Sequence, residues 1–407
     1  MKIKSILILL SLVLLFSTCS EKSNDSKSNN NENALFIDLT ELPKGLENLT
    51  KDIKEIKFVP LETSSECYIS VIKTIIENEN YIFVRDNRGK SILRFDKKGK
   101  YISKIEKIGK GPGEYLKING FSLIPKTQEL LILDFNFNKL LRFNYEGEYI
   151  SKIPIKNTPF GIVALSKEII ACYFGRMKSF NMHDDLNQLY YYDFEGNMTS
   201  SYFPLNSTYS FGMYTQGFAN PNPYESNLLI NSFDYNIYEI KDDLSPKVLV
   251  QLDFGKFNVD TSYYLVDDSR EYTKRYFETT DKIKTLHQAV GNKSHISVGI
   301  PIHISIGTPM ENDRFVLVIN RNNHQNKLLF RDSLRNCFDF NGLSIPEPTS
   351  SYDNYFIAYY SSIDFMDKIN KMTEKELAIL RKNISGFEEC EKLSADDNPI
   401  LVYYSFK

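Results

Sequence analysis

Residues Ile82 to Ile105 read IFVRDNRGKSILRFDKKGKYISKI, and Leu130 to Ile153 read LLILDFNFNKLLRFNYEGEYISKI. A constant shift of 48 aligns the two stretches without a gap and gives ten identities in 24 positions, among them Gly99 with Gly147. A repeat of this length, made of short β-rich runs separated by turns, indicates a copied supersecondary unit that cannot bury its apolar face alone.

Each copy predicts strands joined by a tight hairpin. In the second copy the strand Lys139 to Phe143 is followed by a turn and by the strand Tyr149 to Ile153, and Gly147 lies in that turn, where a positive φ is needed. Sheets of four such strands repeated radially form a β-propeller. A sandwich or a solenoid is the alternative, but the period exceeds that of a leucine-rich repeat and the copies lack the helices of α-solenoids.

Later units repeat the order of strand, strand and turn with more divergence, and together they predict an all-β, six-bladed β-propeller with short helical insertions. Ring closure is expected from the two ends of the chain, with Ile56 to Leu61 pairing with Pro399 to Phe406 in one blade. Helices are predicted within Asp267 to Ala289 and within Thr373 to Ile384, the second beginning with a capping-box pattern. They would lie outside the sheets and could cover one face.

The amino terminus has the layout of a secretory signal. Lys2 and Lys4 precede an apolar run from Ile6 to Phe16, which is too short to span a bilayer. Ser17 and Thr18 before Cys19 are similar to a bacterial lipobox, in which the cysteine is acylated; a plain secreted protein with an incidental cysteine is the alternative. We therefore expect a signal peptide over 1–18, a flexible tether over 19–33 that starts at the lipid-bearing Cys19, and the propeller over 34–407.

Composition narrows the function classes. The formal net charge of −3 gives no basic field for nucleic acid. Beyond Cys19, the four cysteines are scattered singly, so buried thiols are expected and one disulfide remains possible; they are Cys67, Cys172, Cys337 and Cys390. No metal-type spacing occurs, and neither a metal nor a cofactor is expected. A monomer is expected.

Several motifs together carry a family resemblance. They are the VPLET segment starting at Val59, the GKGPGEY segment Gly109 to Tyr115, and Asn398-Pro399 before the closing strand. The chain resembles the six-bladed β-propeller lipoproteins of the Bacteroidetes, which are similar in architecture to NHL and TolB propellers. The resemblance runs from about Leu35 onward and is strongest from Phe58 to Ile153. It implies the fold and a cell-envelope location, at the periplasmic or outer side of the outer membrane, but no activity.

The GKGPGEY segment is glycine-rich but lacks the ending of a phosphate-binding loop. We expect an inter-blade turn in which the glycines supply unusual dihedrals and Glu114 and Tyr115 project toward a face of the ring. The alternative to this structural role is that the segment contacts a ligand directly. The candidate residues of this ligand face or inter-blade loop are Gly109, Gly111, Pro112, Gly113, Glu114 and Tyr115.

The histidines give no catalytic motif. His295 to Ile306 alternates as a half-buried strand would, and its two histidines, His295 and His303, lie too far apart to share a metal. His183 next to Asp184 is a weak candidate for an ion site, since adjacent residues on an exposed loop are usually solvated. Sequence motifs of zinc peptidases and serine hydrolases are absent, and no catalytic residue is assigned.

The sequence therefore predicts a lipid-anchored binding or interaction module of the cell envelope, with a protein, a peptide or a glycan as its ligand. Tyrosine-rich loops such as Tyr190 to Tyr192 and Tyr263-Tyr264 would suit sugar stacking or a protein interface. The competing class is a propeller enzyme, a lyase or hydrolase with an axial site of His and acidic residues. In that case His183, Asp184, Asp86 and Asp134 would meet at one mouth of the ring.

Overall fold

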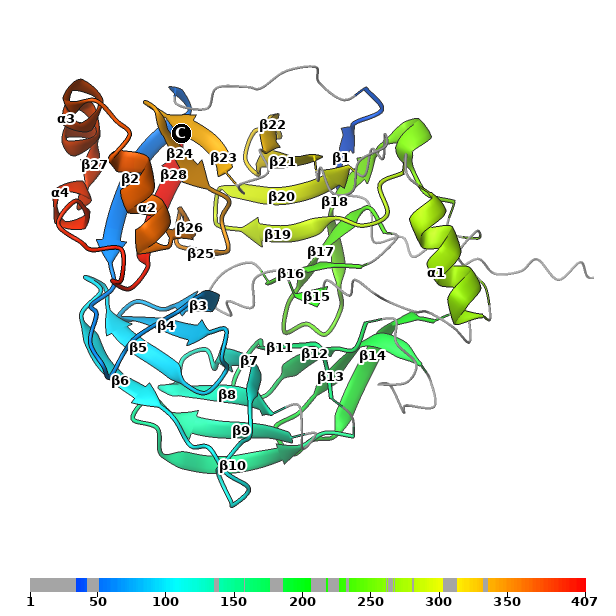
Figure 1. Ribbon diagram of the computed structural model, residues 1–407. Coiled ribbons are helices and arrows are strands. Elements are labelled where there is room, and N and C mark those ends of the chain that lie inside the picture. The colour runs from blue at the N-terminus through cyan, green and yellow to red at the C-terminus, as the bar shows by residue number, and fades with distance from the viewer. Residues whose placement is uncertain are drawn as a thin grey trace, which may run out of the picture.

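Six sheets stand around one axis in the computed structural model, each with four antiparallel strands, and two of them carry a fifth, parallel strand (Figure 1). The structure describes residues 34–41, 51–134, 139–156, 158–175, 186–205, 217–218, 227–231, 234–260, 262, 266, 268–279, 282–302, 313–331 and 336–407. Within these residues the chain is a six-bladed β-propeller. The strands of each blade are called A to D from the axis outward, because the A strands of neighbouring blades contact one another around the axis.

The blades follow one another along the chain. Blade 1 contains β3 (Ile72–Glu77), β4 (Tyr81–Asp86), β5 (Ile92–Asp96) and β6 (Tyr101–Ile105). Blade 2 contains β7 (Ile118–Leu123), β8 (Glu129–Asp134), β9 (Lys139–Asn144) and β10 (Tyr149–Pro154). Blade 3 contains β11 (Gly161–Ala164), β12 (Ile170–Tyr173), β13 (Asn187–Tyr192) and β14 (Met198–Pro204).

The second half of the ring adds strands and helices to this pattern. Blade 4 contains β15 (Gly217–Phe218), β16 (Asn227–Ile230), β17 (Asn236–Ile240) and β18 (Lys247–Asp253), with β1 (Leu35–Asp38) parallel to β18 as a fifth strand. Blade 5 contains β19 (His287–Gly291), β20 (His295–Ile302), β21 (Asp313–Asn320) and β22 (Asn326–Arg331), and a hairpin of β23 (Asn336–Phe340) and β24 (Leu343–Pro346) follows it. Blade 6 contains β25 (Ser350–Tyr352), β26 (Tyr355–Tyr360), β28 (Ile400–Phe406) and β2 (Ile53–Pro60), with β27 (Ile384–Ser385) outside β2.

The predicted repeat is present in three dimensions. Phe95 and Phe143 are both fully buried. Phe95 meets Tyr101 edge-on with ring centroids 6.0 Å apart, and Phe143 meets Tyr149 in the same way at 5.9 Å. The same shift of 48 residues therefore relates side-chain packing as well as backbone.

The predicted ring closure is confirmed. β28 lies between β26 and β2 in blade 6, with Phe58 opposite Val402 and Pro60 opposite Ile400. The polar anchor of this closure is Asn398, which is fully buried. Its side-chain amide donates to the carbonyls of Glu62 and Cys67, and its side-chain oxygen accepts from the backbone N–H of Ile69. The carboxyl-terminal strand is thereby fastened to the connection that leads into blade 1.

Helices occur in the two predicted insertions. α1 (Ser269–Glu278) is capped by Asp268, and α3 (Glu374–Asn383) has the predicted capping box of Thr373 and Glu376. Three short helices were not predicted from the sequence: η4 (Gly255–Phe257), α2 (Ser362–Ile369) and α4 (Phe387–Cys390). In Figure 1, α1 lies at one side of the ring and α2 to α4 lie beside blade 6. Among the described residues, no helix is long and apolar enough to cross a membrane.

Two predictions about exposure were wrong. Tyr190, Tyr191 and Tyr192 are not in a loop but belong to β13, and each is at most 2% exposed. β20 is not half-buried, since His295 and Ser297 on its polar side are also buried. Both strands are interior strands of their blades, and the neighbouring blades cover both of their faces. Tyr263 and Tyr264 lie outside the described residues.

The two ends of the blades differ in their connections. A-to-B turns are short, as at 78–80, 292–294 and 353–354. The B-to-C and D-to-A connections, at the other end of the strands, include 61–71, 106–117, 254–286 and 361–399. We call the first end the turn face and the second end the loop face. Loops on a rigid scaffold are where binding residues concentrate, so the loop face is the first place to look for a site.

Candidate functional site

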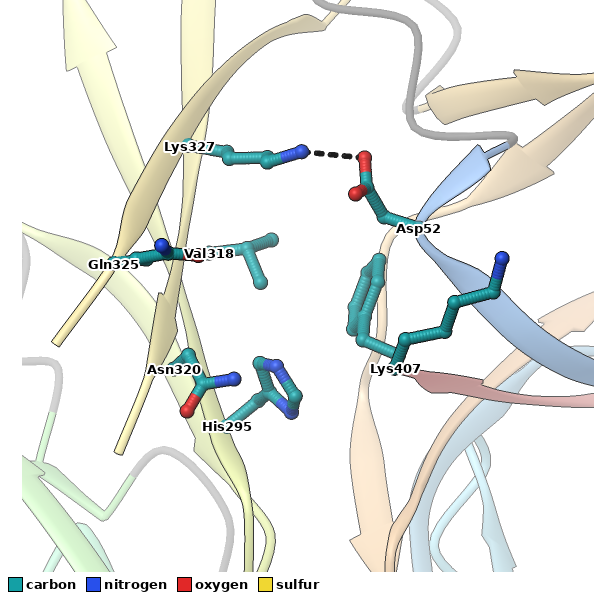
Figure 2. Close-up of a pocket in the computed structure, with 8 residues that line it drawn as sticks. Asp52, His295, Val318, Asn320, Gln325, Lys327 and Lys407 are labelled. Atoms are coloured by element: carbon teal, nitrogen blue, oxygen red, sulfur yellow. Dashed lines mark hydrogen bonds and ion pairs between the residues drawn. The ribbon is translucent and has the colours of Figure 1, made fainter. Parts of the chain in front are cut away.

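One small pocket lies between blades 5 and 6 (Figure 2). It opens where β2 begins and β28 ends, opposite the starts of β20 and β22 and the end of β21. Its volume is about 60 Å³. The lining residues are Asp52, His295, Val318, Asn320, Gln325, Lys327, Phe406 and Lys407.

The pocket combines one ion pair with a buried imidazole. Asp52 and Lys327 face each other across it at 2.5 Å, and both side chains are more than one third exposed, so their interaction is screened by solvent. The His295 ring lies 5.3 Å from the Phe406 ring, and its Nδ1 is 2.9 Å from the Ser294 hydroxyl. Burial lowers the pKa of His295 to about 4. The imidazole is therefore uncharged at physiological pH, and it can donate one hydrogen bond and accept one.

The size of the pocket limits what it can hold. A water molecule takes about 30 Å³ in the liquid, so the space suits about two waters or the end of one polar side chain. Ligand sites for whole small molecules usually measure about 300 Å³ or more. This pocket is consequently too small to hold a whole substrate.

The GKGPGEY segment is part of the D-to-A connection between blades 1 and 2. Tyr115 does not project: its ring is fully buried, and its hydroxyl donates toward the carbonyls of Lys90 and Ile105 at 3.0 Å each. The carboxylate of Glu114 folds back and accepts from the backbone N–H of Gly111 at 2.8 Å. Both side chains thus hold the connection in place.

The glycines of this segment serve two different needs. Gly113 has a φ of +72°, and a Cβ there would meet the Tyr149 ring at 2.6 Å. Gly109 and Gly111 are not in the left-handed region, contrary to the prediction of unusual dihedrals. A Cβ on Gly109 would instead lie 2.0 Å from the Glu114 carboxylate. A larger residue at Gly109 would therefore displace the Glu114 side chain from its place in the loop.

Asp86 and Asp134, the acidic residues predicted for an axial site, each bind groups next to them. Asp86 is paired with Arg88 and accepts from the backbone N–H of Gly89. Asp134 accepts from the backbone N–H of Leu116 at 3.3 Å and lies 3.9 Å from the Lys139 ammonium. Both lie at the loop-face ends of B strands, but no contact joins them in the described structure.

The remaining candidates do not complete an axial site in the described residues. His183, Asp184 and His303 lie outside those residues. The described histidines are His287, His295 and His324, and all three belong to blade 5. The described part of the chain holds no group of three or more His, Cys, Asp and Glu side chains that could bind a metal. Cys67, Cys172 and Cys390 are buried free thiols.

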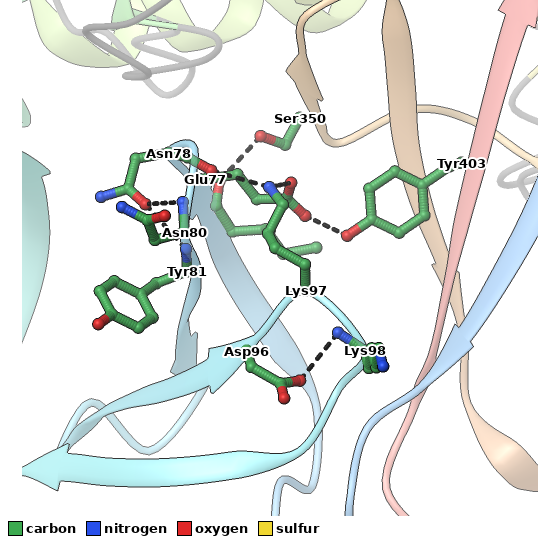
Figure 3. A network of polar contacts seen from close by, with 10 residues as sticks. Glu77, Asn78, Asn80, Tyr81, Asp96, Lys97, Lys98, Ser350 and Tyr403 are labelled. Atoms are coloured by element: carbon green, nitrogen blue, oxygen red, sulfur yellow. Dashed lines mark hydrogen bonds and ion pairs between the residues drawn. The ribbon is translucent and has the colours of Figure 1, made fainter.

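A buried polar network that sequence reasoning missed joins blade 1 to blade 6 (Figure 3). Glu77, at the turn-face end of β3, is fully buried and accepts from the Lys97 ammonium at 2.6 Å and from the Tyr403 hydroxyl of β28. Lys97 also lies 3.9 Å from the centre of the Tyr352 ring. Burial raises the pKa of the Glu77 carboxyl against the opposing effect of Lys97. The partners are far apart in the sequence, so no local pattern could have revealed the network, which ties the closing blade to the first.

Several solved structures match this chain over most of its length. A Bacteroides fragilis protein, provisionally described as exported, matches with a TM-score of 0.69 and 16% identity. The match covers 91% of this chain and 99% of that protein. A member of the duf4221 family from Bacteroides vulgatus matches with a TM-score of 0.49 and 11% identity over 87% of this chain and 97% of its own. BamB from Moraxella catarrhalis gives a TM-score of 0.40 and 8% identity over 87% and 100% of the two chains. No curated protein matches the chain.

Fold and connections thus define a closed six-bladed β-propeller with its long loops on one face. The chain belongs to the family described as a domain of unknown function, DUF4934, whose family model matches residues 37–405.

Proposed function

We propose that this protein is a lipid-anchored binding module of the cell envelope and that its ligand, a protein, a peptide or a glycan, docks on the loop face. The observation that carries the proposal is the difference between the two faces. The A-to-B turns on the turn face are short, whereas the loop face carries long loops, and binding residues concentrate on loops. The secretory pattern before Cys19 supports the envelope location, as does the provisional description of the Bacteroides fragilis neighbour as exported.

Three connections around blade 1 make a continuous part of the loop face. The turn 87–91 contacts the connection 61–71 through Arg88, which donates to the Tyr68 carbonyl at 2.9 Å, and it contacts the connection 106–117 through the Lys90 carbonyl, which accepts from Tyr115. We call 61–71, 87–91 and 106–117 the blade 1 loop surface. It exposes large apolar side chains, with Tyr68 at 47%, Val71 at 49%, Ile108 at 45% and Leu116 at 37% exposure. Apolar side chains that gather on a surface favour a binding role.

Site-specific photo-cross-linking in whole cells tests the proposal. A photoreactive residue replaces Tyr68 or Leu116 on the loop face, and matched controls carry it at the exposed Glu79 or Asn354 in A-to-B turns of the turn face. We expect one discrete adduct, with an envelope protein or with glycan, from the two loop-face positions and not from the controls. Equal labelling from both faces would contradict a ligand face at the loops, and adducts from the turn face alone would reverse the assignment.

A further inference from the structure

Arg85 stands where the repeat has an apolar core residue. The shift of 48 that relates blades 1 and 2 places Arg85 on Leu133, which is fully buried in β8. Arg85 is also buried, with 6% exposure, one residue from the loop-face end of β4. Packing therefore does not require an arginine in this position, and the charge calls for another explanation.

The Arg85 guanidinium has weak partners and no paired carboxylate in the described structure. One terminal nitrogen donates to the Thr74 hydroxyl at 3.1 Å, the other reaches the Ile118 carbonyl at 3.3 Å, and Nε has no partner. The neighbouring Asp86 is bound to Arg88 and to the Gly89 N–H. Burial lowers the pKa of Arg85 to about 10, so the group remains charged at neutral pH. The Asp86 charge opposes this shift, but no carboxylate of the described residues is hydrogen-bonded to the guanidinium. Burying the Arg85 charge is therefore costly, and a bound anion would offset that cost.

Two β-bulges lie beside this guanidinium. In blade 1, Ile72 pairs with Asp86 and Thr74 with Arg85, so Lys73 is the extra residue. In blade 2, Ile118 pairs with Asp134 and Gly120 with Leu133, so Asn119 is the extra residue. Bulges redirect side chains and are frequent next to binding sites. Both bulges occur at the loop-face ends of the innermost strands, and both extra side chains are exposed.

The neighbouring surface is positively charged. Arg88 and Lys90 in the turn 87–91, and Lys117 just before β7, are exposed. Two acidic residues lie among them. The Asp86 carboxylate is held by Arg88, and the Asp134 carboxylate, opposite Ile118, accepts from the Leu116 N–H and lies 3.9 Å from the Lys139 ammonium. This charge complements an anion and disfavours a cation.

We propose that Arg85, Lys73 and Asn119 form a site for an oxyanion group, a carboxylate or a phosphate, at the axial end of the blade 1 loop surface. The proposal deepens the proposed function and rests on it in one respect, since the anion would be part of the ligand that docks on the loop face. A guanidinium and an ammonium supply charge-assisted hydrogen bonds to such a group, and an amide side chain adds a neutral donor. The class of ligand that this site selects is therefore acidic: an acidic sugar, an acidic peptide or a phosphate ester.

Thermal unfolding of the full-length protein with defined anions tests the site. The probes are inorganic phosphate, glutamate and glucuronate, each compared with chloride at the same ionic strength. We expect at least one of the three to raise the Tm of the wild-type protein by about 2 °C or more beyond chloride. A response to inorganic phosphate alone would indicate a phosphate ligand, and a response to glutamate or glucuronate would indicate a carboxylate. The stronger of the two carboxylate responses distinguishes an acidic peptide from an acidic sugar.

Two variants and one control locate the effect. Arg85→Leu introduces the residue that blade 2 has at this place, and it should abolish the anion-dependent rise without lowering the Tm in chloride, because it replaces a buried charge with an apolar side chain. Lys73→Gln should weaken the apparent affinity roughly tenfold, as expected for one charge-assisted hydrogen bond. The control Arg142→Leu removes a blade 2 arginine that pairs with Glu129 and should keep the full anion response.

Two results would overturn the site. If none of the three anions stabilises the wild-type protein and Arg85→Leu lowers the Tm, Arg85 serves to hold the Ile118 carbonyl. If Arg85→Leu and Lys73→Gln retain the anion response, the anion binds elsewhere. Neither result depends on the cross-linking experiment, so a failure of this site and a failure of the loop-face function can be told apart.

Discussion

Three glycines at equivalent places show how single residues hold neighbouring blades together. Gly99, Gly147 and Gly196 lie in C-to-D turns with φ values of +85°, +84° and +90°. Because the blades twist, each of these turns meets the end of the preceding outer strand at the rim of the ring. A Cβ would lie 2.1 Å from the Pro60 carbonyl oxygen at Gly99 and 2.2 Å from the Pro154 carbonyl oxygen at Gly196, but at Gly147 the nearest atom is a side-chain carbon of Ile105 at 3.4 Å.

Alanine at these positions should separate dihedral strain from steric overlap. Gly147→Ala should cost about 1 kcal/mol, the usual penalty of a positive φ without overlap. Gly99→Ala and Gly196→Ala should cost roughly 3 kcal/mol or more, since backbone must also move away from the new methyl group. Urea denaturation of the three variants measures the difference, and equal losses would show that the inter-blade contacts at Gly99 and Gly196 yield easily.

The pH dependence of stability should contain a contribution from His295. Its pKa is about 4 in the folded protein because of burial, against about 6.5 when exposed. The unfolded chain binds the proton first, so this contribution to stability is fully present above pH 6.5 and is lost as the pH falls toward 4. His295→Gln should therefore flatten the fall of the Tm between pH 6.5 and 4, whereas the control His324→Asn, at an exposed turn, should leave it unchanged. A fall as steep in His295→Gln as in the wild type would contradict a buried neutral imidazole.

Sequence reasoning succeeded for single residues where the requirement is local. The turn glycine at Gly147 follows from a hairpin, and the capping box of Thr373 and Glu376 follows from spacing. It did not succeed for Gly109, whose missing Cβ makes room for a carboxylate five residues on, nor for Arg85, whose meaning depends on strands of two blades. Such requirements arise in the folded structure and leave no periodic signal.

At the scale of elements, the strands that repeat were predictable and the strands that are added were not. The repeat placed β4 to β6 and β8 to β10, and the apolar end strands placed β2 and β28 together. β1 is a different case: it pairs in parallel with β18, and its partner is more than 200 residues away. A short strand on a distant edge has no pattern that specifies its partner.

These two kinds of strand should differ in their contribution to folding. Deleting 399–407 removes β28 from between β26 and β2 and exposes two sheet edges, so it should abolish cooperative unfolding of the whole ring. Deleting 34–41 removes an outer strand with two buried side chains, Ile37 and Leu39, and should cost about 3 to 6 kcal/mol while the ring stays closed. Limited proteolysis checks both: blades 1 and 2 should become sensitive in the first variant and remain resistant in the second. Resistance in both would mean that β28 does not fasten the circle.

At the scale of the whole molecule, the sequence predicted the closed ring but not its site. Closure follows from apolar end strands that need partners, and Asn398 shows how the last strand is fastened to the connection into blade 1. A site on a propeller is assembled from loops of several blades, and their meeting depends on the twist and position of every sheet. The Glu77 network depends on the whole ring in the same way, since Glu77 and Tyr403 meet only when the ring has closed.

The proposed attachment to a membrane is the last feature to test, because it would decide where the proposed ligand meets the loop face. Cys19 follows an apolar run that is too short to span a bilayer, and acyl chains on Cys19 would contribute about 0.8 kcal/mol per buried methylene, enough for stable anchoring when there are two or more. Cys19→Ala should therefore move the protein from the membrane fraction to the soluble fraction after a high-salt wash. The matched control Cys390→Ala changes a buried thiol in the propeller and should leave the protein with the membranes. If Cys19→Ala still partitions with membranes after the wash, attachment does not depend on acylation at this residue, and the propeller reaches the membrane through another part of the chain.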